Sequence, residues 1–137
     1  EAEALLCAVT AYTSRLAHRQ ATAGRSTLLT WAEKALAAAD RAVELSQDGN
    51  EAQALLGRAL ALFAFSILEP SRREQALAAA ESSEISFTDL SDRRGVVKAL
   101  LTQIKVLYQE VDHHAEAATR LKKARVLCRG DEDFLLL

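Results

Sequence analysis

A repeat with a 41-residue period constrains the fold of this chain more than any other feature. Ala35, Ala76 and Ala117 lie at equal separations, 41 residues from 35 to 76 and again from 76 to 117. The segments around them align as EKALAAADRAVEL, EQALAAAESSEIS and EAATRLKKARVL, with small or apolar residues at the fourth and seventh places after each alanine. Small residues at that spacing let two helices approach closely, as stacked helix pairs require. The repeat therefore predicts an array of helical hairpins.

Apolar periodicity predicts that these hairpins are built from six antiparallel helices in an all-α chain. The expected helices cover residues 1–20, 27–45, 51–68, 71–82, 91–108 and 113–128. They group into three pairs, about 1–49, 50–88 and 89–130, within one domain. Alanine and leucine are abundant, whereas the sequence has one proline and five glycines, so few residues interrupt helices or favour strands.

Local end signals predict where these helices start and stop. Asn50 followed by Gln53 has the spacing of a capping box, and so has Ser71 followed by Glu74, directly after Pro70. Asp112 is expected to cap the sixth helix.

The fourth helix is expected to fade between Ser82 and Ser86, because serine side chains compete for backbone hydrogen bonds. Phe87 and Leu90 are then expected to pin the connection that follows.

The third helix, 51–68, has one charge after its first turn, Arg58, and an apolar run from Ala59 to Phe65 that leaves no polar face. A helix that is apolar all round is covered on several sides. The chain has no run of 18 apolar residues free of charge, so we expect no transmembrane helix.

The repeat resembles tetratricopeptide (TPR) repeats, most closely between residues 33 and 60. Ala35, Ala39 and Ala42 resemble the small residues of a TPR second helix, and Leu56, Gly57 and Leu60 resemble the start of the next first helix; Leu101, Ile104, Tyr108, Ala117 and Ala124 repeat much of this pattern. The period of 41 exceeds the usual TPR period of about 34 and falls within the range of HEAT and armadillo arrays. Those arrays and a compact bundle are the alternatives.

The resemblance implies a concave groove lined by the first helix of each pair. The matching residues are Thr10, Ser14, Ala54, Arg58, Ala61, Thr102, Val106 and Gln109. Some TPR domains hold the acidic C-termini of heat-shock chaperones with a set of Lys, Asn and Arg. The corresponding places here are Leu6, Thr10, Leu55, Ala99 and Gln103, so we do not expect that class of partner.

The sequence shows no sign of catalysis, of a cofactor or of a metal site, so we expect no enzyme. It has no glycine-rich phosphate loop and no nucleophile elbow. His113 and His114 are adjacent, so on a helix they point about 100° apart and cannot easily share a metal. Cys7 and Cys128 are expected to be reduced thiols packed as small apolar side chains, which favours an intracellular compartment. The missing Met and the apolar end, Phe134 to Leu137, suggest a piece of a longer protein.

Three hypotheses about function follow. The first is a scaffold or adaptor that binds a peptide or helix of another protein in the groove. The second is a structural segment that packs on its own chain or on a second copy, as the apolar third helix and Leu135 to Leu137 suggest. The third is RNA binding by a basic patch on the sixth helix, formed by Arg120, Lys122, Lys123 and Arg125. The net charge of −2 gives no strong basic field, so the sequence does not favour nucleic acid as a partner.

Overall fold

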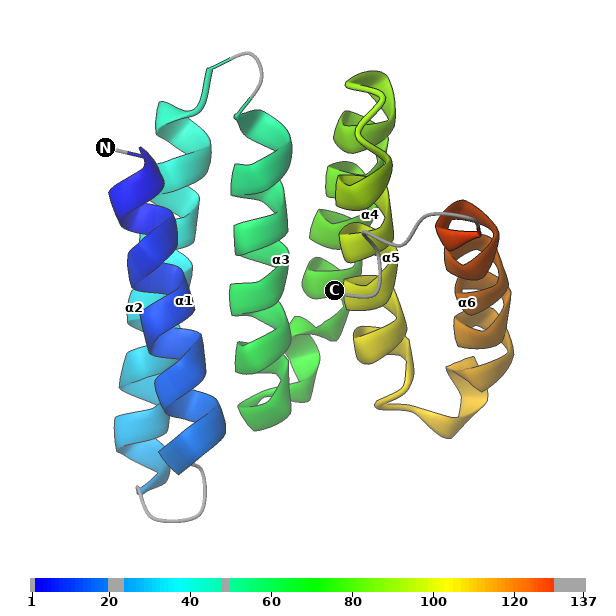
Figure 1. The fold of residues 1–137 in the computed structure, drawn as a ribbon. Helices are drawn as coiled ribbons and strands as arrows, with labels where there is room; N and C mark the ends of the chain where they lie inside the picture. Colours follow the sequence, from blue (N-terminus) through cyan, green and yellow to red (C-terminus); the bar gives the residue numbers. More distant parts are fainter. Residues whose placement is uncertain (1, 20–23, 48–49, 130–137) are drawn as a thin grey trace.

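The computed structural model describes residues 2–19, 24–47 and 50–129. These residues form six α-helices, two short 3-10 helices and no strand, which confirms the prediction of an all-α fold (Figure 1). The α-helices are α1 (Ala2–Arg19), α2 (Arg25–Leu45), α3 (Glu51–Leu68), α4 (Arg73–Asp89), α5 (Arg93–Leu107) and α6 (His114–Cys128), and the 3-10 helices are η1 (Pro70–Arg72) and η2 (Val111–His113).

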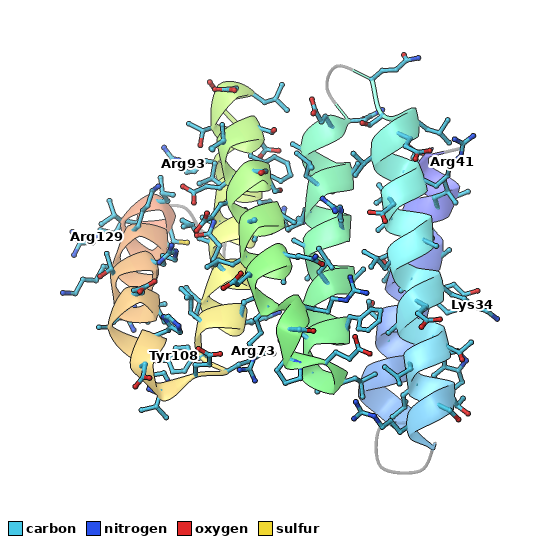
Figure 2. The ribbon with its side chains drawn as sticks, turned by 180° about the vertical axis from the view of Figure 1, so that it is seen from behind. Lys34, Arg41, Arg73, Arg93, Tyr108 and Arg129 are labelled. Atoms are coloured by element: carbon cyan, nitrogen blue, oxygen red, sulfur yellow. The ribbon has the colours of Figure 1, made fainter. Side chains whose placement is uncertain are left out.

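Consecutive helices pack against one another from α1 to α6, as expected for antiparallel hairpins. In addition, α3 contacts both α1 and α5. In Figure 1, α1 lies in front of α2 and α5 lies in front of α4, and this order is reversed when the molecule is seen from behind in Figure 2. The helices α1, α3 and α5 therefore adjoin on one side of the molecule, and α2 and α4 lie on the other.

The repeated alanines lie where these helices touch. Ala35, Ala76 and Ala117 each have no exposed surface, and the same holds for Ala39 and Ala80, four residues further on. Around Ala39 the contact includes Val9 of α1 and Ala61 of α3. A side chain of one methyl group lets the backbones of adjacent helices come close, so the 41-residue period marks the contact side of each second helix.

Helix α3 is the centre of the fold, because it contacts α1, α2, α4 and α5. Leu62 and Phe65 are almost completely buried, and burial of each such side chain stabilises a fold by about 1.5–3 kcal/mol. Of the helices in the described part of the chain, α3 alone has the length and apolar composition of a membrane span, and half of it is buried inside the protein. Its four neighbours account for the apolar character of most of its surface, whereas Leu60 and Ile67 are exposed.

The predicted capping boxes do not form. Asn50 precedes α3 in a helical backbone conformation and makes no side-chain cap, whereas a capping residue needs an extended backbone to reach the first amides. Ser71 lies inside η1 and Asp112 inside η2, so the helices that follow begin later than expected and lack a side-chain cap. Asp92 does cap its helix, since its Oδ1 accepts a hydrogen bond of 2.9 Å from the amide of Gly95.

The prediction that the fourth helix fades near residues 82–86 is also wrong, because α4 continues to Asp89. The buried hydroxyl of Ser83 donates to the carbonyl oxygen of Ala52 on α3, at 3.1 Å, instead of competing with its own backbone. Phe87 is buried at the end of α4, as expected for a residue that holds the following connection in place. Leu90 is 51% exposed, so its side chain does not hold the connection.

Candidate functional site

The side of the molecule formed by α1, α3 and α5 is the candidate site, and we call it the α1–α3–α5 face. Its exposed residues lie at helical spacing on each of the three helices, with the acidic ones confined to the starts of α1 and α3. The exposed residues are Glu3, Cys7, Thr10 and Ser14 on α1, Glu51, Gln53, Leu60 and Ile67 on α3, and Arg94 and Lys105 on α5. Tyr108, directly after α5, is also exposed, and Lys98 and Leu101 lie half-buried between Arg94 and Lys105. The prediction that Cys7 packs as an apolar side chain is wrong, because it is exposed; both cysteines are free thiols.

The eight predicted groove residues occupy three different environments. Thr10 and Ser14 are exposed on this face, as expected. Ala54, Ala61, Thr102 and Val106 are buried, at 0–4% exposure, and offer no surface to a partner. Arg58 and Gln109 are half-buried and already occupied by contacts within the protein.

The contacts of Arg58 and Gln109 are with neighbouring helices. The Nε of Arg58 lies 2.8 Å from Oδ1 of Asp40 on α2. The side-chain oxygen of Gln109 accepts hydrogen bonds from Nε of Arg73, at 2.9 Å, and from the hydroxyl of Ser66, at 3.3 Å. Both side chains therefore form hydrogen bonds to neighbouring helices and do not face a groove.

At three of the expected positions on α3 and around α5, the exposed residue is the one directly before the expected one. On α3 the exposed residue is Leu60 where the resemblance indicated Ala61. Around α5 the exposed residues are Lys105 and Tyr108 where Val106 and Gln109 were indicated. One residue corresponds to about 100° around a helix, so the expected positions face the neighbouring helices. The spacing of Arg94, Lys98 and Lys105 could have identified the exposed side, because lysine and arginine are almost never buried without a partner.

A shallow depression of about 160 Å³ lies between α1 and α3 on this face. It is lined by Leu6, Val9, Thr10, Thr13, Gln53, Leu56, Gly57 and Leu60. The two helices approach closely here, since a Cβ atom added to Gly57 would lie 2.6 Å from Cδ2 of Leu6. Small-molecule sites usually enclose about 300–1,000 Å³, so this depression is smaller than a typical small-molecule site.

The predicted basic patch on α6 is divided between two roles. The guanidinium of Arg120 lies 3.2 Å from Oε1 of Glu81 on α4, and Nζ of Lys123 lies 2.5 Å from Oε2 of Glu84 on the same helix. These two cations hold α6 against α4. Lys122 and Arg125 are exposed and make no ion pair with the described residues. The four residues therefore do not form one free cationic surface.

Gln103 is the centre of the polar contact between α4, α5 and α6. Its side chain is 1% exposed. It donates to Oε1 of Glu84 at 2.8 Å and accepts from Nε of Arg120 at 2.7 Å. Burial alone would raise the pKa of Glu84, but the hydrogen bonds from Lys123 and Gln103 outweigh it, so the pKa of Glu84 lies below its usual range.

A cavity of about 520 Å³ lies between the starts of α4 and α6 and the end of α5. Three of its ionisable groups contact one another: a guanidinium nitrogen of Arg73 lies 2.6 Å from Oε1 of Glu110, and Nε2 of His113 lies 3.0 Å from Oε2 of the same carboxylate. The hydrogen bond from Arg73 holds the pKa of Glu110 below its usual range. Figure 2 shows Arg73 and Tyr108 at this end of the molecule.

Among the described residues, no group of three or more His, Cys, Asp and Glu side chains is arranged to hold a metal ion. The cavity beside Arg73 contains the ion pair of Arg73 with Glu110, whereas the α1–α3–α5 face has exposed side chains from three helices. No family model, curated protein or solved structure matches this chain.

Proposed function

We propose that this chain is a TPR-like interaction module that binds a helix or peptide of another protein across the α1–α3–α5 face. One observation carries the proposal: on the central helix, Leu60 and Ile67 are 37% and 49% exposed on the side not covered by the neighbouring helices. Their neighbours Ala59, Ala61, Leu62 and Ser66 are buried, so the exposed apolar side chains lie on the central helix of the core. Partly exposed apolar side chains on a rigid scaffold are the usual anchors of a protein interface.

The sequence of contacts also supports the TPR-like proposal. Each first helix, α1, α3 or α5, packs on the second helix of its own pair, and α3 and α5 also pack on the second helix of the preceding pair. The first helices contact each other along the array, as expected for an array whose first helices share one face.

A displayed library of 16-residue peptides, selected against the immobilised chain, tests the proposal directly. Selected peptides should bind the chain and lose about tenfold or more in affinity to the double variant Leu60→Asp, Ile67→Asp, because partial burial of each side chain stabilises the complex by about 1 kcal/mol. The matched control is Ile85→Asp on α4, which is 63% exposed on the other side of the molecule. Peptides that bind the double variant as well as the parent chain would refute the proposal.

Self-association through the same apolar surface is the second candidate function. The exposed side chains of Leu60 and Ile67 suit a second copy of the chain as well as they suit a different protein. Light scattering over a range of concentrations separates the two. A dimer that forms with increasing concentration and is abolished by Leu60→Asp, Ile67→Asp supports the packing role, whereas a monomer at all concentrations supports capture of another protein.

A further inference from the structure

Helix α5 has an unusual charge pattern for a chain whose net charge is −2. It contains Arg93, Arg94, Lys98 and Lys105 and no acidic residue. Arg94, Lys98 and Lys105 are separated by four and seven residues, so they lie on one side of the helix. With a rise of about 1.5 Å per residue, this row of cations is about 17 Å long. We call these three residues the α5 cation row.

The cations of the α5 row make no ion pair with the described residues. Several other cations of the chain are paired. Arg41, Arg58 and Arg73 pair with carboxylates on α2 or directly after α5, and Arg120 and Lys123 pair with carboxylates of α4. Within the described part of the chain, Arg94, Lys98 and Lys105 thus form a row of positive charge on the α1–α3–α5 face that no carboxylate neutralises.

The α5 cation row borders an apolar surface. Leu101 lies between Lys98 and Lys105 on the same side of α5, and the neighbouring helix α3 exposes Leu60 and Ile67. On the far side of α3, the exposed residues in the middle of α1 include Cys7, Thr10 and Ser14, which carry no formal charge. The face therefore has an apolar band with positive charge along one edge and neutral polar groups along the other.

We infer that the α1–α3–α5 face binds an acidic amphipathic helix, whose apolar stripe covers Leu60, Ile67 and Leu101 and whose Asp and Glu side chains line one edge of that stripe. The inference rests on the proposed function and names the chemistry of the partner. A helix suits the site because carboxylates at positions i, i+4 and i+11 of a partner repeat the spacing of the α5 cation row. Charge complementarity of this kind determines which partner binds and how fast.

RNA is less suited to the same surface. A single-stranded nucleic acid needs aromatic side chains on which its bases can stack, and Tyr108 is the one aromatic residue beside the α5 cation row that is exposed in the described part of the chain. A phosphate backbone would also leave the apolar band next to the row uncovered. An acidic amphipathic helix satisfies both parts of the surface.

Three synthetic peptides of 18 residues and one oligonucleotide test the inference by fluorescence anisotropy. The first peptide has a leucine stripe bordered on one edge by glutamates, and the second has lysines in place of those glutamates. The third has the composition of the first in an order without a stripe. A 16-nucleotide single-stranded RNA is the fourth probe. The first peptide should bind at least tenfold more tightly than each of the other probes.

Variants of the chain locate the binding site. The triple variant Arg94→Gln, Lys98→Gln, Lys105→Gln should weaken binding of the acidic peptide about tenfold at low salt and reduce its salt dependence, because each exposed ion pair contributes modestly. The matched control is Lys34→Gln, Lys122→Gln, Arg125→Gln, which removes the same charge from exposed cations of α2 and α6 that make no ion pair with the described residues. Figure 2 shows Lys34 on the outer edge of α2, away from α5.

Four results would overturn the inference: equal binding of the acidic and basic peptides, equal binding of the peptide without a stripe, tighter binding of RNA, or equal loss of affinity in the two triple variants. Failure of the charge inference is distinguishable from failure of the proposed function. If acidic and basic peptides bind equally but both lose affinity to Leu60→Asp, Ile67→Asp, the face still binds helices and only the charge preference is wrong. If that double variant changes nothing, both proposals fail.

Discussion

Replacing each of two helical glycines by alanine should destabilise the protein at one position and not at the other. Alanine favours a helix interior over glycine by about 0.8–1.0 kcal/mol, so propensity alone predicts that both Gly57→Ala and Gly95→Ala stabilise the fold. The two added methyl groups would meet different surroundings, however, so we expect different effects on stability. At Gly95, the new Cβ would lie 2.5 Å from Cγ and Cε1 of the Phe87 ring and still closer to Cδ1.

The ring of Phe87 cannot move aside easily. It is 1% exposed and packs in a cluster with buried residues of α3, α5 and α6. Adding a methylene to a well-packed core costs about 1–3 kcal/mol, and the gain from helix propensity is smaller in the first turn of α5 than in a helix interior. We expect Gly95→Ala to destabilise the protein by about 1–2 kcal/mol and to lower its thermal midpoint by about 3–8 °C.

At Gly57 the contact is different in kind. The added methyl group would meet Cδ2 of Leu6, the end of a flexible side chain that is only half-buried. A small rotation of that side chain relieves the contact. We therefore expect Gly57→Ala to leave the midpoint unchanged or to raise it, and this variant is the matched control for Gly95→Ala.

Urea and thermal unfolding of both variants, followed by circular dichroism, measure the difference. The double variant Gly95→Ala, Phe87→Leu should cost less than the sum of the two single changes, because the smaller side chain makes room for the methyl group. A midpoint of Gly95→Ala at or above that of the parent protein would refute the packing argument. Strict additivity in the double variant would refute the assignment of the cost to Phe87.

Three further predictions concern helix contacts and pH. Ala39→Leu should destabilise the fold by about 1–3 kcal/mol, because Ala39 is completely buried; an unchanged thermal midpoint would count against closely stacked hairpins. Gln103→Leu should cost about 1–3 kcal/mol in urea unfolding, because it removes hydrogen bonds from two partners in a buried network; no loss would show that the network adds nothing. Since the pKa of folded Glu84 is below its ordinary value of 4.5, its contribution is present above that pH and is lost as pH falls through the folded pKa. The thermal midpoint of Glu84→Gln should therefore vary less between pH 5 and pH 3 than that of the parent or of Glu33→Gln, a change at an exposed carboxylate on α2.

The helices and their contact sides could be predicted from the sequence because both depend on repeated local patterns. The period of Ala35, Ala76 and Ala117 identified residues that are completely buried. The positions of the helix starts could not be predicted as well. Ser71 has the residue type and spacing of a cap, but Pro70 begins a 3-10 turn that takes in this serine.

The candidate site was harder to predict than the fold, because its residues depend on the rotation of each helix. Helix periodicity indicates which residues share a side, but the neighbours of a helix decide which side stays exposed. On α3, which is apolar all round, nothing in the periodicity distinguishes Leu60 from Ala61, although only Leu60 is exposed. The contact of the Ser83 hydroxyl could not be predicted from periodicity either, because the carbonyl oxygen that it binds, that of Ala52, belongs to another helix, 31 residues away in the sequence.

The attachment of α6 has a consequence for the order in which the protein opens. Of its residues only Ala117 and Ala124 are buried, and much of its contact with α4 consists of ion pairs such as Lys123 with Glu84. Amide hydrogens exchange through local opening, and the elements with few buried apolar contacts open first. The amides of α6 should therefore exchange before those of α3, and added salt should widen this difference by weakening the ion pairs. The ionic strength of the surroundings should therefore change how often α6 opens while the helices packed around α3 stay closed.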